Sequence, residues 1–159
     1  DCVRSWAKEE YVQLRYPQAT RPWQHVLEPL SGYLTLAMEL SQDAQLHGEP
    51  FNFGPPAEQN FSVGHLVTQM SKHLDNVHWQ DASEKWNGPY ESGLLKLNCD
   101  KALHKLGWRA IWNFERTVKE TVEWYKTYYE QPDIIATMTN SQIMRYQQDA
   151  NEMGLVWAQ

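Results

Sequence analysis

The feature that most constrains this chain is the shortness of its strand-like segments. Apolar or alternating runs with strand character cover only residues 11–15, 51–53, 77–80 and 94–97. Strands of three to five residues do not form a stable sheet on their own. The segments between them are longer and have helical periodicity. The pattern therefore predicts a mostly helical α/β chain whose short strands add to a larger framework.

Six segments are predicted to be helices, over residues 2–8, about 27–43, 62–74, 101–106, about 113–130 and 140–151. Asn113 is placed to cap the fifth helix, and Pro132 follows its end. Gly32 lies inside the second helix, at a cost of about 0.5–1 kcal/mol relative to alanine, so we expect close packing there. The last helix is polar, with Ile143, Met144 and Tyr146 as its only anchors, and we expect a loose tail over 154–159.

Size and charge limit the function classes. The chain has 159 residues, 14 Lys and Arg against 20 Asp and Glu, and a formal net charge of −6, which suits one domain. An acidic balance argues against a nucleic-acid or anionic-membrane surface, and no apolar run approaches the roughly 18 residues of a membrane span. Cys2 and Cys99 cannot build a disulfide framework, so they fit a cytoplasmic setting and are expected to be buried and unreactive. Because the predicted first helix starts at once after Asp1, we expect a piece of a longer protein.

Motifs for catalysis are absent from the sequence. It contains no G-x-G-x-x-G, P-loop, G-x-S-x-G or H-E-x-x-H pattern, and no tyrosine is followed four places later by lysine. His65 and His73 share one predicted helix but stand two turns apart, without a supporting Cys or Asp cluster. Trp108, Trp112 and Trp124 occupy core-like positions, which favours packing over a carbohydrate platform. No catalytic residue and no metal ligand is therefore predicted.

The most specific motif is Arg21-Pro22-Trp23-Gln24-His25-Val26-Leu27-Glu28-Pro29-Leu30-Ser31-Gly32-Tyr33-Leu34. Further matching segments follow in register: F-N-F-G-P at 51–55, S-V-G-H-L-V at 62–67, P-Y-E-S at 89–92, L-K-L-N-C-D-K-A at 95–102, L-G-W at 106–108 and T-V-E-W-Y at 121–125. Together they resemble CDP-glucose 4,6-dehydratases, a group of extended short-chain dehydrogenase/reductases. The resemblance covers about residues 1–146. Tyr90 replaces the usual His and Asn98 the usual Asp, and the polar tail 147–159 lies outside it.

The resemblance implies an enzyme of two parts. Its N-terminal Rossmann half would bind NAD and carry the Tyr-x-x-x-Lys couple, and its smaller C-terminal part would bind the sugar nucleotide. This chain corresponds to the C-terminal substrate-binding part, with the Rossmann half absent, and is expected to be inactive alone. The complete enzyme would convert CDP-glucose to CDP-4-keto-6-deoxyglucose and water in deoxysugar and polysaccharide biosynthesis. The implied partners are CDP-glucose, the N-terminal half and a second copy in a homodimer.

Four residues are candidates for substrate binding. Arg21 offers the charged donor fork that a nucleotide diphosphate needs, and the resemblance places the arginine of this motif there; a surface arginine is the alternative. Arg15, six positions earlier, is a candidate for the phosphates or the ribose. The resemblance brings Asn52 to the diphosphate, although a turn-capping asparagine is the alternative. Glu91 is a candidate acceptor for the cytosine amino group, against an ordinary solvated loop glutamate.

Two other functions stay open. Another NDP-sugar dehydratase or epimerase of the same family would share the fold, but those typically continue R-D-W or R-D-Y where this chain has Arg21-Pro22-Trp23. A non-catalytic sugar-nucleotide or carbohydrate-binding module fits the eight tryptophans and the missing catalytic motifs. The sequence upstream of Asp1 would discriminate between these functions.

Overall fold

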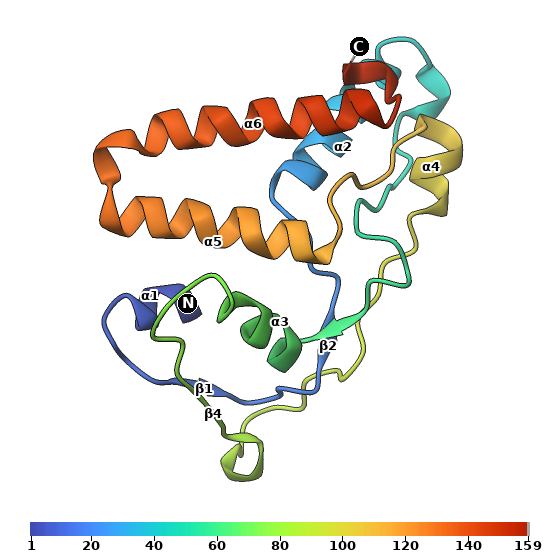
Figure 1. Cartoon of the computed structure of the whole chain (residues 1–159). Helices are drawn as coiled ribbons and strands as arrows, with labels where there is room; N and C mark the ends of the chain where they lie inside the picture. Colours follow the sequence, from blue (N-terminus) through green and yellow to red (C-terminus); the bar gives the residue numbers. More distant parts are fainter. Residues whose placement is uncertain (159) are drawn as a thin grey trace.

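The computed structural model describes residues 1–158, which form helices and two pairs of very short strands (Figure 1). The helices are α1 (Cys2–Trp6), α2 (Leu27–Leu40), α3 (Val63–Met70), α4 (Asp100–Leu106), α5 (Phe114–Glu130) and α6 (Ile135–Glu152). The strands are β1 (Val12–Leu14), β2 (Thr20–Arg21), β3 (Phe61–Ser62) and β4 (Trp79–Asp81). Single 3-10 turns are η1 (Ala44–Leu46), η2 (Ser83–Lys85), η3 (Pro132–Ile134) and η4 (Val156–Ala158). The predicted mixture of helices and short strands is confirmed.

The strands form two separate pairs rather than one sheet. β1 runs parallel to β4, and β2 runs antiparallel to β3. Thr20 of β2 makes one further bridge, to Leu94. Each pair is only two or three residues long, which is too short to form a sheet that is stable on its own.

Two of the predicted strands are wrong. Residues 51–53 join no ladder in the described structure, and of 94–97 only Leu94 makes a single bridge. Pro50 and Pro55 flank the first segment and have no N–H to donate to a ladder. The ring of Phe53 instead packs edge-on against Trp108, with ring centroids 4.9 Å apart. Side-chain packing therefore takes the place of strand pairing in this segment.

The first hydrophobic core lies between α1, α3, α5 and β1. Its buried side chains are Val3, Trp6, Leu14, Val67, Met70, Phe114, Val118 and Val122. Figure 1 shows α1 and α3 between the β1–β4 pair and α5. Asn113 caps α5 as predicted, because its side-chain oxygen accepts a hydrogen bond from the Arg116 N–H at 2.9 Å.

The second core joins α2 to α4. It consists of Leu46, Phe53, Ala102, Leu106 and Trp108. Gly32 lies directly against this core, since a Cβ added there would be 2.4 Å from the Phe53 ring. The predicted close packing at Gly32 is confirmed.

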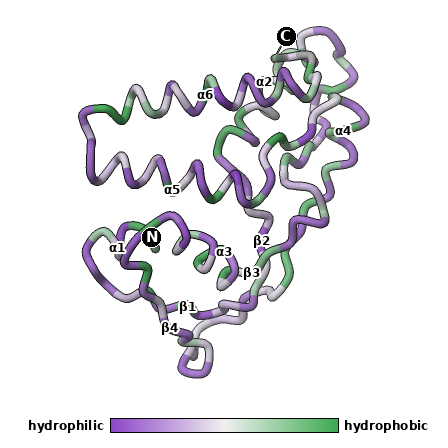
Figure 2. Tube along the Cα trace, viewed as in Figure 1, coloured by the Kyte–Doolittle hydropathy of each residue, from purple (hydrophilic) through white to green (hydrophobic). Residues whose placement is uncertain are grey.

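Helix α6 lies antiparallel to α5 (Figure 1), and both helices are mainly hydrophilic (Figure 2). α6 begins at Ile135, earlier than predicted. Tyr146 is buried as expected, but Met144 is 69% exposed and does not anchor the helix. Leu155 is also buried, so the predicted loose tail is wrong at that residue. Gln159, at the end of that tail, lies outside the described residues.

Over the part of the chain that the structure covers, each helix is too short or too polar to cross a membrane.

Candidate functional site

Arg21 ends β2, and the proline that follows keeps its backbone extended. Its Nη1 donates hydrogen bonds to the backbone carbonyls of Thr20, at 2.8 Å, and Ser92, at 2.9 Å. Its Nη2 donates to the Glu91 carboxylate, with which it forms an ion pair. The side chain of Arg21 is 19% exposed and that of Glu91 is 42% exposed. The structure thus brings together two of the four predicted site residues.

The backbone around Glu91 is fastened to β2. The Thr20 N–H donates to the Gly93 carbonyl at 2.8 Å, and the Leu95 N–H donates to the Thr20 carbonyl at 3.3 Å. The Ser92 hydroxyl donates to the Leu94 carbonyl at 2.8 Å. These bonds hold the segment after Glu91 beside Arg21 and leave the Glu91 side chain at the surface.

Asn52 has a structural contact in this protein. Its Nδ2 donates to the Asn98 carbonyl at 3.2 Å, which ties segment 51–53 to the residues before α4. Asn52 is exposed, and among the described contacts none joins it to Arg21 or Glu91.

Arg15 lies over the connection that leads to Glu91. Its guanidinium is 4.6 Å from the centroid of the Trp86 ring, a cation–π contact. Gly88 packs against the same ring, since a Cβ added there would lie 2.0 Å from it. Arg15 and Arg21 therefore hold one connection, residues 82–92, at different points.

His25, four residues after Arg21, faces the interior, and the sequence did not single it out. It is 5% exposed, and its ring packs edge-on against Trp112 with centroids 4.9 Å apart. Its Nδ1 accepts a hydrogen bond from the Leu27 N–H at 3.3 Å. Burial lowers the pKa of His25 to about 4, and the negative charge of Glu120 opposes this shift only in part.

Glu28 was also missed, because it lies with Ser31 and Thr35 on the polar side of α2, which the structure buries, whereas the apolar side with Leu30 and Leu34 is exposed. Its carboxylate is fully buried and accepts hydrogen bonds from the N–H groups of Ile111 and Trp112, at 3.0 and 2.8 Å, and from the Tyr146 hydroxyl at 2.8 Å. Burial raises the pKa of Glu28, while these three donors favour the charged form. Glu28 thus links α2 to the segment before α5 and to α6.

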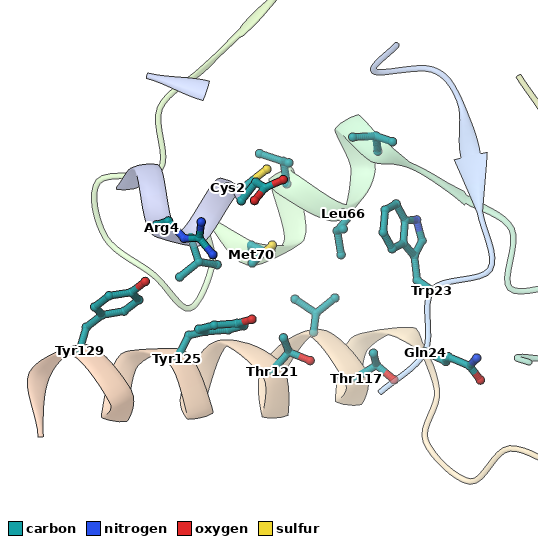
Figure 3. Close-up of a pocket in the computed structure, with 15 residues that line it drawn as sticks. Cys2, Arg4, Trp23, Gln24, Leu66, Met70, Thr117, Thr121, Tyr125 and Tyr129 are labelled. Atoms are coloured by element: carbon teal, nitrogen blue, oxygen red, sulfur yellow. The ribbon is translucent and has the colours of Figure 1, made fainter. Parts of the chain in front are cut away.

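A cavity of about 420 Å³ lies between α1, α3 and α5 (Figure 3). Trp23 and Gln24 border one end, and Tyr125 and Tyr129 border the other (Figure 3). Most of its lining is apolar, and neither Arg21 nor the other three candidate residues line it. The cavity is therefore separate from the predicted site.

The cysteines and tryptophans are placed only partly as predicted. Cys2 and Cys99 are free thiols that are half-buried rather than buried, and burial raises the pKa of the Cys99 thiol. Trp108 and Trp112 are buried, whereas Trp124 is half-buried and its Nε1 donates to the Thr139 hydroxyl at 2.9 Å. Across residues 1–158, no group of three or more His, Cys, Asp or Glu side chains could hold a metal ion.

Comparison with known proteins connects this chain with sugar-nucleotide dehydratases. One curated relative is the CDP-glucose 4,6-dehydratase of Salmonella typhimurium (strain LT2), which is 38% identical to this chain over 136 residues. The match covers 85% of this chain and 37% of the length of that relative. No protein-family model matches the chain. The resemblance derived from the motifs is therefore confirmed over most of this chain.

Proposed function

We propose that this chain is the sugar-nucleotide-binding part of an NAD-dependent CDP-glucose 4,6-dehydratase, a lyase that forms CDP-4-keto-6-deoxyglucose and water. The observation that carries the proposal is the 38% identity over 85% of the chain to a dehydratase of that specificity. Residues 1–146 are proposed as the binding domain and 147–159 as its polar tail, although α6 continues across this boundary to Glu152. Because this chain spans 37% of the length of that relative, the complete reaction is proposed to need the rest of the enzyme as well.

Arg21 is proposed to bind the diphosphate of the substrate. Its guanidinium is always charged and presents five N–H donors in a fixed fork. Two neutral backbone carbonyls and one carboxylate hold it, so it is oriented before a ligand arrives. A pre-oriented donor loses less conformational entropy on binding. Arg15 and Asn52 are proposed to lie at the edges of the same substrate site.

This chain is proposed to supply binding and orientation but no redox chemistry. It contains no glycine-rich dinucleotide motif, so its residues do not fit an NAD site, and NAD is proposed to bind in the other half of the enzyme. Interactions with the non-reacting nucleotide hold the sugar in place for a reaction whose acid and base lie elsewhere.

An exposed apolar face of α2 supports the proposed contact with that other half. Val26, Leu30, Tyr33, Leu34 and Met38 follow one side of the helix, and each is 45–69% exposed. A contiguous apolar surface of this kind marks an interface. We propose that the NAD-binding half of the same enzyme covers this face, and a second copy in a homodimer is the competing occupant.

Two measurements test the proposed function. Calorimetric titration of the chain with CDP, UDP and dTDP should show binding that prefers CDP, and Arg21→Ala should weaken it about 10- to 150-fold, as expected for a hydrogen bond to a charged group. Arg109→Ala, which removes an exposed arginine elsewhere, is the control. Preference for UDP or dTDP would favour another dehydratase or an epimerase.

The second measurement concerns turnover. The chain with CDP-glucose and NAD should form no 4-keto sugar. After the NAD-binding remainder of the Salmonella relative is added, the mixture should form 4-keto sugar. Turnover by the chain alone would contradict the proposal, and absence of any nucleotide binding would favour a carbohydrate-binding module.

A further inference from the structure

The ion pair between Arg21 and Glu91 suggests how the candidate site controls anion binding. We propose that Glu91 is an internal counter-ion, which occupies the Arg21 fork in the free protein and which the phosphates of a nucleoside diphosphate displace. This inference rests on the proposed function and assigns Glu91 a role different from reading the cytosine base. Its consequence is that Glu91 weakens binding of every diphosphate, whatever the base.

The contacts of Arg21 divide into a fixed set and an exchangeable one. Nη1 bonds to the carbonyls of Thr20 and Ser92, and the backbone bonds between Thr20 and residues 93–95 hold both carbonyls in place. Nη2 bonds to Glu91, which is the one charged partner of Arg21 among the described contacts. If Glu91 leaves, the two carbonyls still hold the guanidinium in the same position.

Glu91 can leave at little cost. Its side chain is 42% exposed, more than twice the 19% of Arg21, and Arg21 is its single described partner. A carboxylate that turns toward solvent regains its hydration, and the pair itself contributes little because it is partly exposed. Residues 87–90 before it are also exposed, so they leave open space for the movement.

A diphosphate is the stronger ligand for the vacated fork. It carries more negative charge than one carboxylate and several acceptor oxygens, so it can accept the Nη2 hydrogen bond that Glu91 gives up while Nη1 stays bound to the two carbonyls. With Glu91 in place, the incoming phosphate meets a like charge and a donor that is already occupied. Glu91 therefore acts against every anion at Arg21, in contrast to a base reader, which would act on one nucleotide.

The test is calorimetric titration of the chain and its Glu91→Gln variant with CDP, UDP and inorganic pyrophosphate. Glutamine keeps the size of the side chain and removes its charge, so all three ligands should bind about 2- to 10-fold more tightly. Glu84→Gln is the matched control, because it removes an exposed charge from the same connection and should leave the three affinities nearly unchanged.

Each other outcome has one meaning. Weaker binding of CDP alone would make Glu91 a base reader and overturn the counter-ion role. Unchanged affinities in Glu91→Gln, with Arg21→Ala still weakening all three ligands, would also overturn it and leave the proposed function in place. If Arg21→Ala has no effect on any ligand, the diphosphate site itself is wrong. If Glu84→Gln and Glu91→Gln raise the affinities equally, the cause is the net charge of the protein, and this result would contradict a specific Arg21–Glu91 pair.

Discussion

The acid stability of this protein is expected to depend on one imidazole, that of His25. The ring is buried against Trp112, and burial lowers its pKa from 6.5 to about 4. The native protein therefore keeps the ring neutral at pH values at which the unfolded chain protonates it. Between pH 6.5 and about 4 the unfolded state binds more protons, so the free energy of unfolding falls as the pH decreases through this window.

The size of the effect follows from the two pKa values. The shift of the His25 pKa from 6.5 to about 4 contributes about 3 kcal/mol to the pH dependence of the free energy of unfolding. About 2 kcal/mol of this is lost between pH 7 and pH 5. Glu28 contributes in the opposite direction, because burial raises its pKa above the ordinary value of 4.5. Above pH 4.5 its contribution therefore falls as the pH rises. The pH dependence of wild-type stability alone therefore does not separate the contribution of His25 from that of Glu28.

The variant His25→Asn separates them. Asparagine is able to accept the Leu27 N–H through its side-chain oxygen, as His25 does through Nδ1, and it does not titrate. Urea unfolding at pH 7, 6 and 5 should show that wild-type protein loses about 2 kcal/mol more than His25→Asn over this range. His104→Asn replaces an exposed histidine on α4 and should follow the wild-type profile.

Parallel profiles for wild type and His25→Asn would refute the reasoning. Should His25→Asn not fold at pH 7, an NMR titration of the wild-type imidazole gives the answer directly. A His25 pKa near 6.5 in the folded protein would then contradict a buried neutral ring.

Three further predictions concern stability and association. Tyr146→Phe removes the hydroxyl that donates to the buried Glu28 carboxylate, so urea unfolding should show a loss of about 1.5–3 kcal/mol. Gly32→Ala places a methyl group against the Phe53 ring, which already packs on its other neighbours, and should cost about 1–3 kcal/mol in the same measurement. Leu34→Lys puts a charge on the exposed face of α2 and should lower the mass of associated species in light scattering, without a change in the free energy of unfolding.

Each of these three has a matched control. Tyr128→Phe removes the hydroxyl of a tyrosine that is 47% exposed, and Gly93→Ala adds a methyl group where no atom lies within 4 Å. Both should be nearly neutral, and a loss equal to that of the test variant would contradict the assigned contact. Leu103→Lys places the same charge on α4, so an equal fall in association would show that the α2 face is not specific.

Local signals predicted the helices well and the strands poorly. α5 begins after Asn113 and ends at Glu130, as its cap, its periodicity and Pro132 indicated. These signals lie within the helix itself. A strand needs a partner elsewhere in the chain, and residues 51–53 have none, while the β2–β3 pair has no periodicity at all because each strand has two residues. A short apolar run therefore indicates that a segment is packed, but it does not predict whether the segment pairs with another strand.

The candidate site was predicted residue by residue but not as an arrangement. Arg21 and Glu91 were chosen for different reasons, a diphosphate and a base, and the structure pairs them. The contact joins residues 70 positions apart, and no local pattern encodes it. In the structure Arg15 contacts Trp86, and Asn52 contacts the Asn98 carbonyl. The type of a residue therefore does not determine which partner it contacts.

The attachment of α6 shows the physical limit of hydrophobic periodicity. The helix is polar along most of its length, yet Gln142 and Tyr146 are buried in it. The Gln142 amide donates to the Glu120 carbonyl at 2.6 Å, and the Tyr146 hydroxyl donates to Glu28. A buried polar group stabilises a fold when its partners satisfy it, so a helix can be anchored without an apolar stripe. A count of apolar positions includes Tyr146 but does not detect Gln142.

The same contacts explain why the motif from Arg21 to Glu28 needs particular residue types at both of its ends. Arg21 reaches the surface and the Glu91 carboxylate, while His25 and Glu28 turn inward to Trp112, Ile111 and α6. One end presents the charged fork that is proposed to bind an anion, and the other places His25 and Glu28 among buried hydrogen-bond partners. Because the residues share one short segment, the inner contacts fix the backbone that leads to Arg21. The orientation of the proposed diphosphate ligand therefore depends on a buried network that touches no ligand.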